Sequence, residues 1–245
     1  MSSRKRKSSG RRSADQSVIG ARVIGTDETI NDIVRYIIYR AGEHMNFTKG
    51  ELTRNVISKS DKSFEDVIND ACIVLREVYG YNLILNANSK SKEKNYIVSN
   101  ILPCISDPEE MPEDTDKIVL LLVLSHIFMT NNNVTDISLY NFLKNVGIDV
   151  EQRHPIFGLV KDYINKVLIK RQYLVSEIDN ITQVQRFKWG SRAENEISKL
   201  AILKFVSKVY PNRKPEDWDD QYKTSREQNF QKSLDNFDDQ NSSQN

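Results

Sequence analysis

The sequence predicts a mainly α-helical protein with small β-hairpins, an α+β chain made of two winged-helix domains in tandem. In each half of the chain, apolar residues recur with the helical period over three successive segments. Each set of three segments is followed by two short β-prone runs that indicate a hairpin. A chain of 245 residues is long enough for two small domains, each burying its own core.

The first half predicts helices over residues 28–42, 48–57 and 63–80 and strands over residues 81–85 and 95–99. The second helix begins with a Thr-x-x-Glu capping box, in which side chain and backbone at the helix start satisfy each other. The third helix follows a serine that is suited to the N-cap position and ends at a glycine. These signals give the order of elements of a winged helix.

The second half repeats this order and adds one helix. The expected elements are helices over residues 117–129, 135–146 and 156–170, strands over residues 173–178 and 184–189, and a closing amphipathic helix over residues 193–210. We therefore expect the two halves to share one architecture.

Five parts of the chain follow from these patterns. We expect a disordered basic head over residues 1–27, a first winged-helix domain over 28–102, an acidic linker over 103–116, a second winged-helix domain over 117–212, and a polar acidic tail over 213–245. The head has too few apolar residues to offset the entropy of ordering. Its cluster of Arg and Lys indicates a nuclear-localisation or polyanion-binding arm, or simply a solvated tail.

Composition excludes several classes of function. The two cysteines are far apart and the three histidines lack metal-ligand spacing, so we expect no disulfide framework, no metal and no cofactor. Phosphate-binding loops and nucleophile elbows are missing from the sequence, which favours a binding protein over an enzyme. The longest apolar run is well short of the roughly 20 residues of a membrane span, and no apolar stretch follows the basic head as in a secretory signal. The cytosol or nucleus fits these features.

A short run near the end of the second hairpin identifies a family. Residues 187–193 read Phe-Lys-Trp-Gly-Ser-Arg-Ala, which resembles the Phe-x-Trp-Gly-Pro-Arg-Ala signature of the MAGE family, with Ser191 where many members carry proline. Residues 78–80, Val-Tyr-Gly, are similar to the family's Val-Phe-Gly turn. The resemblance covers residues 28–210 and implies tandem winged helices.

The signature also has a purely structural interpretation. In a strand, Phe187 and Trp189 share one face while Arg186 and Lys188 share the other. We expect the two aromatic side chains to lie in the core, and we expect Ser191 to cap the helix that follows.

Membership of the MAGE family implies binding to a RING-type ubiquitin ligase through a dileucine in the first helix. The matching residues here are Ile37 and Ile38. Isoleucine keeps the apolar character of the pair but changes its shape. Two interpretations remain open: both residues complete the local core, or one of them faces the partner, because adjacent helical residues point about 100° apart.

Basic residues of the second domain are candidates for contact with DNA. In a winged helix, the third helix and the wing are the parts most often presented to nucleic acid. We expect the third helix to bury the stripe Ile156, Leu159, Val160, Tyr163, Ile164 and Val167. The candidate phosphate-binding residues are Lys161, Lys166, Lys170, Arg171, Arg186 and Lys188. The alternative is an ordinary solvated face, because Asp162 and Glu177 interrupt it.

Three hypotheses about function remain. The resemblance is closest to the MAGE-like, non-SMC subunits of SMC five/six complexes, which implies a nuclear, non-catalytic scaffold in chromosome maintenance and DNA repair. Its implied partners are a RING-type ubiquitin ligase subunit, a kleisin subunit and duplex DNA without strong sequence preference. The second hypothesis is a MAGE-type ligase adaptor without a chromosomal role. The third is a winged-helix transcription factor, for which the sequence offers no clear base-reading pattern.

Overall fold

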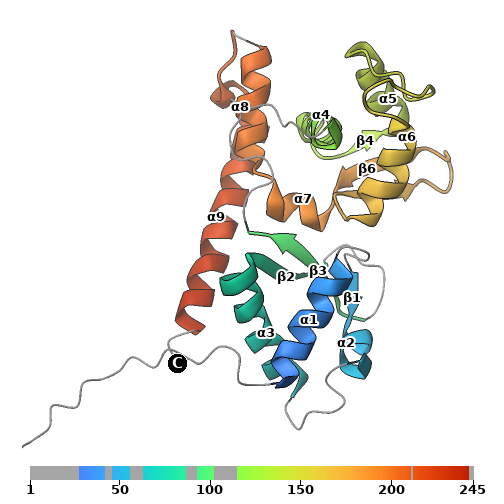
Figure 1. The fold of residues 1–245 in the computed structure, drawn as a ribbon. Helices are drawn as coiled ribbons and strands as arrows, with labels where there is room; N and C mark the ends of the chain where they lie inside the picture. The colour runs from blue at the N-terminus through green and yellow to red at the C-terminus, as the bar shows by residue number, and fades with distance from the viewer. Residues whose placement is uncertain are drawn as a thin grey trace, which may run out of the picture.

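A computed structural model of the chain describes residues 28–41, 46–55, 63–86, 93–101, 115–210 and 212–242. The head expected over residues 1–27 and most of the expected acidic linker lie outside the described residues. Within the described ranges, two units each combine helices with a three-stranded antiparallel sheet, and a long helix follows the second unit (Figure 1). The predicted α+β class with tandem winged helices is confirmed.

The first unit has the predicted order of three helices and a hairpin, with one short strand added. Its elements are α1 (Glu28–Ala41), β1 (Asn46–Thr48), α2 (Lys49–Asn55), α3 (Phe64–Tyr79), β2 (Tyr81–Leu85) and β3 (Asn95–Asn100). The sheet order is β1-β3-β2. Thr48 Oγ1 accepts a hydrogen bond from Glu51 N at 3.0 Å, and the Ser63 side chain accepts one from Asp66 N at 3.2 Å. Both side chains therefore cap the helices that they were expected to cap.

The second unit repeats this arrangement. Its elements are α4 (Thr115–Met129), β4 (Val134–Thr135), α5 (Asp136–Asn145), α6 (Val160–Asp162), η2 (Tyr163–Leu168), β5 (Leu174–Ile178), β6 (Gln185–Trp189), α7 (Ser191–Glu196) and α8 (Lys199–Val209). The sheet order is β4-β6-β5, which mirrors the order in the first unit.

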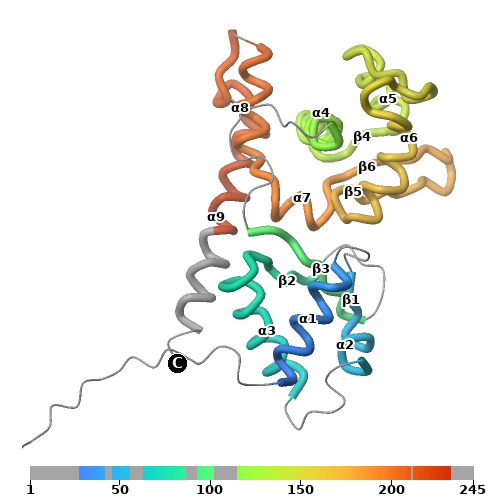
Figure 2. The backbone as a smooth tube through the Cα atoms, viewed as in Figure 1, coloured from blue at the N-terminus to red at the C-terminus, as the bar shows by residue number. Residues whose placement is uncertain are grey.

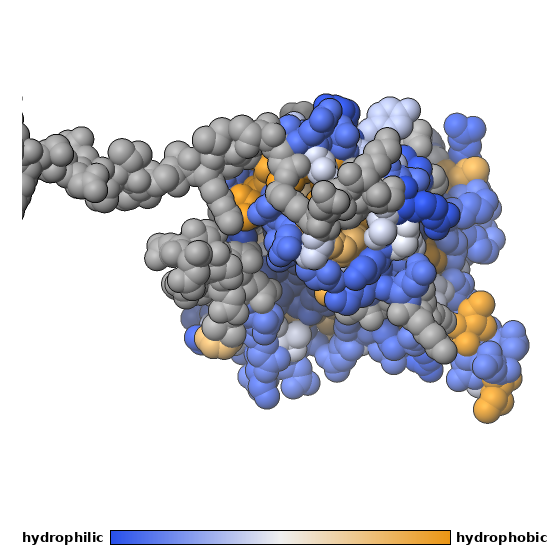
Figure 3. Space-filling model, turned by 90° about the horizontal axis from the view of Figure 1, so that it is seen from below, coloured by the Kyte–Doolittle hydropathy of each residue, from blue (hydrophilic) through white to orange (hydrophobic). Residues whose placement is uncertain are grey.

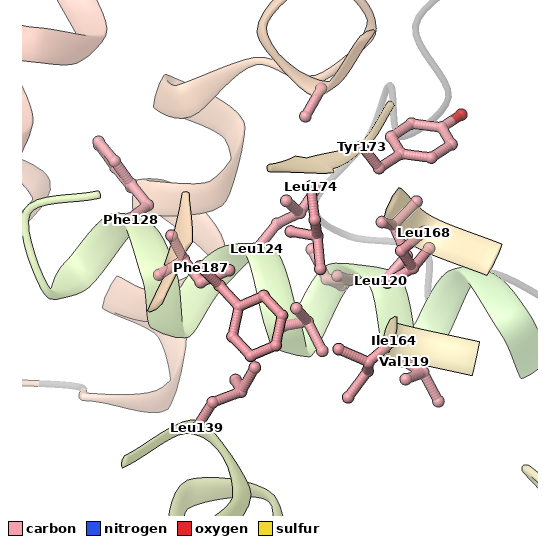
Figure 4. Close-up of a cluster of buried hydrophobic side chains, with 14 of the residues drawn as sticks. Val119, Leu120, Leu124, Phe128, Leu139, Ile164, Leu168, Tyr173, Leu174 and Phe187 are labelled. Atoms are coloured by element: carbon pink, nitrogen blue, oxygen red, sulfur yellow. The ribbon is translucent and has the colours of Figure 1, made fainter. Parts of the chain in front are cut away.

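Each unit encloses its own hydrophobic cluster. In the second unit, α4 is apolar on nearly all sides because α5, η2, α8 and the sheet surround it. Figure 4 shows Leu120 and Leu124 of α4 among side chains that come from these other elements, such as Phe187 of β6. Phe187 is fully buried and Trp189 is 3% exposed, which confirms that these aromatic residues are core. Burial of each such side chain contributes about 1.5–3 kcal/mol.

The third helix of the second unit begins later than the sequence predicted. It starts at Val160, and Ile156 and Leu159, expected in its buried stripe, are 65% and 59% exposed. Before it, His154 N and Gly158 O form a 2.9 Å hydrogen bond in a tight turn, and His154 Nδ1 accepts the backbone N–H of Ile156. The imidazole thus accepts a backbone hydrogen bond that replaces one of the hydrogen bonds of a helix. The buried stripe consists of Val160, Ile164 and Leu168.

The single closing helix expected over residues 193–210 is divided into α7 and α8. Ile197 has extended backbone angles and is 1% exposed, so the break turns its side chain into the core. Ser198 begins the new helix, and its side chain accepts the N–H of Ala201. Ser191 is not the cap of α7, because Gly190 occupies that position without a side-chain hydrogen bond.

The segment expected as a polar acidic tail contains a helix that docks on the second unit. A short 3-10 turn, η3 (Pro215–Asp217), leads into α9 (Asp219–Ser242), which packs against α8 (Figure 2). Gln228 of α9 forms hydrogen bonds with backbone groups at the break between α7 and α8. Its Nε2 donates to Glu194 O at 2.9 Å and to Ile197 O at 3.1 Å, and its Oε1 accepts from Lys199 N at 2.8 Å. The polar composition of the segment did not predict these contacts.

Among the residues coloured in Figure 3, the surface seen from below is largely hydrophilic, with hydrophobic side chains in separate small patches. None of the helices in the described ranges combines the length and hydrophobicity that a membrane crossing needs. No cluster of His, Cys, Asp and Glu suited to a metal ion occurs in the part of the chain that the structure describes.

His126 is a half-buried imidazole in α4. It stacks on Phe142 with ring centroids 4.3 Å apart, and its Nε2 lies 3.3 Å from Ser138 Oγ. Burial lowers the pKa of His126 below its usual value of 6.5, because the charged form loses its hydration.

This depressed pKa predicts a pH-dependent loss of stability. As the pH falls below the ordinary value of 6.5, the unfolded chain takes up a proton at His126 while the folded chain resists it. Wild type should therefore lose more unfolding free energy than His126→Gln between about pH 7.5 and about pH 5.5. Urea denaturation at the two pH values measures this difference, and parallel losses in both proteins would contradict it.

Candidate nucleic-acid interface and the junction between the units

The helix that was expected to face nucleic acid runs through α6 and η2, and its second part is π-helical. Asn165, inside the π-helical run, donates its side-chain N–H to Lys161 O at 2.9 Å. In an α-helix this carbonyl accepts from the backbone N–H of Asn165, so the side chain competes with the α-helical ladder. π-Helical turns are rare and occur frequently at functional sites.

Asn165 also ties the helix to the wing. Its Nδ2 donates to Tyr140 OH at 2.8 Å, and its Oδ1 accepts from Gln185 Nε2 at 3.0 Å. Gln185 Nε2 further donates to Ser176 Oγ on the neighbouring strand at 2.7 Å. Burial raises the pKa of Tyr140 above its usual value, so its hydroxyl stays protonated. This network of neutral polar groups fixes the helix relative to β5, β6 and α5. Sequence reasoning missed it, because isolated Asn and Gln residues give no pattern.

Two of the expected phosphate-binding lysines on this helix are ion-paired. Lys161 Nζ lies 2.6 Å from Glu151 Oε1, and Lys166 Nζ lies 3.0 Å from Asp162 Oδ2. The hydrogen bond to Glu151 raises the pKa of Lys161. Each of the two lysines therefore has a carboxylate beside it.

Lys170 and Arg171 follow at the end of the helix and are exposed. Neither forms an ion pair with another residue in the described ranges. Directly after them, Gln172 adopts a left-handed backbone conformation with φ of 61°, which turns the chain into β5. On this helix, these two cations are therefore the ones that no carboxylate of the described residues neutralises.

Arg186 and Lys188 lie on a different side of the second unit. Because Phe187 and Trp189 point into the core, the alternation along β6 places Arg186 and Lys188 on the outer face of the sheet. The helix packs its Ile164 onto the core side instead. Lys188 Nζ pairs with Glu177 Oε2 of β5 at 2.9 Å.

The expected site is thus divided. The structure separates a helix group, Lys161, Lys166 and Lys170, from a sheet group, Arg186 and Lys188, with Arg171 in the turn between the helix and the sheet. The two acids expected to interrupt the patch, Asp162 and Glu177, are direct partners of its lysines.

The two isoleucines that correspond to the family's dileucine have different environments. Ile37 is fully buried in the core of the first unit. Ile38 is half-buried and packs against the same core. Ile38 therefore keeps part of its surface accessible, whereas Ile37 supports the helix from within.

The junction between the two units centres on the carboxylate of Glu196, in α7. Its side chain is fully buried and forms an ion pair of 2.7 Å with Arg192 Nε, and it also accepts the hydroxyl hydrogen of Tyr173. From the first unit, Asn100 N donates to Glu196 Oε1 at 2.9 Å. Strand β3 and helix α7 pack together at this point.

A second set of polar contacts flanks this carboxylate. Asn86, at the end of β2, donates to Gln172 Oε1 at 3.0 Å and accepts from Ser191 Oγ at 3.0 Å. Gly190 lies so close to the same turn that a Cβ at this position would be 2.2 Å from Gln172 O. Within the family signature, Ser191 therefore contacts the first unit, and Gly190 packs against the turn before β5.

These features define a tandem winged-helix protein whose units meet through the turn after the second wing. The chain belongs to the MAGE family, because residues 33–200 match the MAGE homology domain. The resemblance inferred from residues 187–193 is confirmed.

Individual relatives are consistent with this family. The human "non-structural maintenance of chromosomes element 3 homolog" is 29% identical over 198 residues, covering 79% of this chain, and its mouse counterpart is 28% identical over the same length and share of the chain. The rat melanoma-associated antigen D1 is 29% identical over 204 residues, covering 80% of this chain and 25% of the relative. The chain spans 64% of the length of the human relative and 70% of the mouse one.

Among solved structures, a chain of the "Nse1-Nse3-Nse4 complex" is similar to this protein. The TM-score is 0.67 at 28% sequence identity, and the match covers 81% of this chain and 96% of that chain. The likeness thus extends over nearly the whole of the solved chain.

Substitution of Glu196 tests the junction. Glu196→Gln removes the charge that compensates the buried Arg192 guanidinium, so we expect a loss of about 3–5 kcal/mol in unfolding free energy. Urea denaturation measures this loss, and hydrogen exchange at the Asn100 amide should become faster. Glu227→Gln, at an exposed position of α9, is the matched control and should change stability by no more than about 0.5 kcal/mol. A stable Glu196→Gln protein with a protected Asn100 amide would show that the junction does not depend on this carboxylate.

Proposed function

We propose that the chain is a non-catalytic, nuclear scaffold subunit of an SMC five/six type complex in chromosome maintenance and DNA repair. It binds a RING-type ubiquitin ligase subunit, a kleisin subunit and duplex DNA. The observation that carries this proposal is the match over 96% of a chain of the Nse1-Nse3-Nse4 complex. The human and mouse relatives named for maintenance of chromosomes support the same assignment.

The DNA contact is assigned to the basic residues of the second unit. The helix group and Arg171 present exposed cations along the helix of a winged helix, the element most often placed against nucleic acid. Ammonium and guanidinium groups neutralise phosphates and release counterions, so binding is salt-sensitive and largely independent of sequence. Arg186 and Lys188 form a second candidate surface on the outer face of the sheet.

Charge reversal of the helix group tests this contact. Lys161→Glu/Lys166→Glu/Lys170→Glu should weaken binding to a random-sequence duplex at least about tenfold at low salt. The slope of the logarithm of the binding constant against the logarithm of the salt concentration should become shallower by about 0.9 for each phosphate that the variant no longer neutralises. Fluorescence anisotropy across salt concentrations measures both quantities. A separate Arg186→Glu/Lys188→Glu variant reports on the sheet group.

The matched control reverses three exposed cations on α8 and α9, Lys204, Lys223 and Arg226, which changes the net charge by the same amount. Both triple variants should remain folded, because all six side chains are exposed. Equal losses in the two triple variants would indicate a general charge effect. Absence of binding by wild type at low salt would remove DNA from the proposal.

The RING contact is assigned to the surface of α1 around Ile38. Ile38→Arg places a charge on half-buried apolar surface and should strongly reduce co-purification of the co-expressed RING-type subunit. Ile37→Val is the matched control, because it trims a fully buried side chain by one methyl group and should leave the exposed surface unchanged. Retained binding by a folded Ile38→Arg protein would place the contact elsewhere.

A MAGE-type ligase adaptor without a chromosomal role is the second candidate. The 29% identity to melanoma-associated antigen D1, as high as that to the human chromosome-maintenance relative, favours it. The two candidates differ in DNA binding, so the salt titration of the wild-type chain separates them.

A further inference from the structure

The lysines of the helix group differ in what a phosphate has to displace. Lys161 and Lys166 are held 2.6 Å and 3.0 Å from the carboxylates of Glu151 and Asp162, whereas Lys170 has no ion-pair partner among the described residues. Glu151 and Asp162 are themselves exposed, with 67% and 52% of their side-chain surface accessible. Any anion that approaches Lys161 or Lys166 therefore meets a carboxylate already in place.

Displacing such a carboxylate has two electrostatic consequences. The lysine exchanges one anionic partner for another, so the net gain is smaller than for an unpaired cation. The carboxylate that is set free stays within a few ångströms of the incoming phosphate and repels it. It also takes up a counterion from solution, which offsets part of the counterion release that drives polyanion binding.

We propose that Glu151 and Asp162 act as built-in competitors that determine which anions this helix accepts. The inference rests on the proposed DNA contact and deepens it by naming the residues that set ligand class. An isolated phosphate gains too little from one ion-paired lysine to bind. A duplex, whose closely spaced phosphates engage Lys161, Lys166 and Lys170 together, displaces both carboxylates in one event.

The test is a gain of binding, which a damaged fold cannot mimic. Glu151→Gln/Asp162→Asn should bind a random-sequence duplex about 3- to 30-fold more tightly than wild type at low salt, from two exposed ion pairs at the usual strength. The slope of the logarithm of its binding constant against the logarithm of the salt concentration should be steeper by up to about 0.9 for each lysine that is released from its carboxylate. Fluorescence anisotropy over a range of salt concentrations measures both.

The first unit supplies a matched control. Asp32→Asn/Glu65→Gln neutralises two acids that are also ion-paired, with Arg35 and Lys49, and that are exposed to a similar extent, 51% and 60%. This variant has the same net charge as Glu151→Gln/Asp162→Asn. At about 0.1 M salt it should gain little affinity compared with Glu151→Gln/Asp162→Asn, because exposed charges more than about 10 Å apart are largely screened there.

A titration with inorganic phosphate tests the discrimination directly. The NMR signals of the Lys161 and Lys166 Cε groups should shift at lower phosphate concentrations in the double variant than in wild type. Equal duplex affinity in wild type and Glu151→Gln/Asp162→Asn would overturn the inference while leaving DNA binding intact. An equal gain in the first-unit control would also overturn it. No binding by any of the three proteins would overturn both the inference and the proposed DNA contact.

Discussion

The position of one unit relative to the other depends on how the buried carboxylate of Glu196 is satisfied. A carboxylate without exposed surface is strongly destabilising unless charged and hydrogen-bonded partners surround it. Here the partners come from Arg192 in the same helix, from Tyr173 before β5, and from the backbone of Asn100 in the first unit. An apolar residue would fill the same space, but it would not require the end of β3 to point its N–H at α7. The buried carboxylate therefore fixes the orientation of β3 relative to α7, in addition to filling space in the contact between the units.

The core of the second unit and the junction together account for most residues of the family signature. Phe187 and Trp189 fill the core, Arg192 holds Glu196, and Ala193 is fully buried. Gly190 is required because any Cβ would collide with the carbonyl of Gln172. Ser191, which replaces the proline of many relatives, donates its hydroxyl hydrogen to Asn86 of the first unit, a bond that proline has no group to form.

Elements with a long periodic pattern or a side-chain cap were predictable from the sequence, and those defined by tertiary contact were not. Helix α3 has its Ser63 cap, its apolar stripe and a left-handed Gly80, and all three are local signals. Strand β4 has two residues, too few for any period. The docking of α9 depends on hydrogen bonds from Gln228 to the backbone at the break between α7 and α8, and this break exists only in the folded chain. Alternation along the strand predicted that Arg186 and Lys188 face away from the core, but their separation from the lysines of the helix required the folded unit. The Asp162 partner of Lys166 lies one helical turn away and was foreseeable, whereas Glu151 lies in a preceding loop.

The chain has a formal net charge of only +1, and its cations are widely matched by acids. The DNA contact proposed above would be weak when the protein is alone, because few of its lysines are unopposed and the candidate residues are divided between a helix and a sheet face. Within an assembly, a subunit held near DNA by its partners experiences a high effective concentration, and a weak contact is then sufficient. The same weakness limits capture of unrelated polyanions by the free subunit. Near-neutrality and DNA contact are therefore compatible in a scaffold subunit, whereas an independent DNA-binding protein requires a stronger and more continuous basic surface.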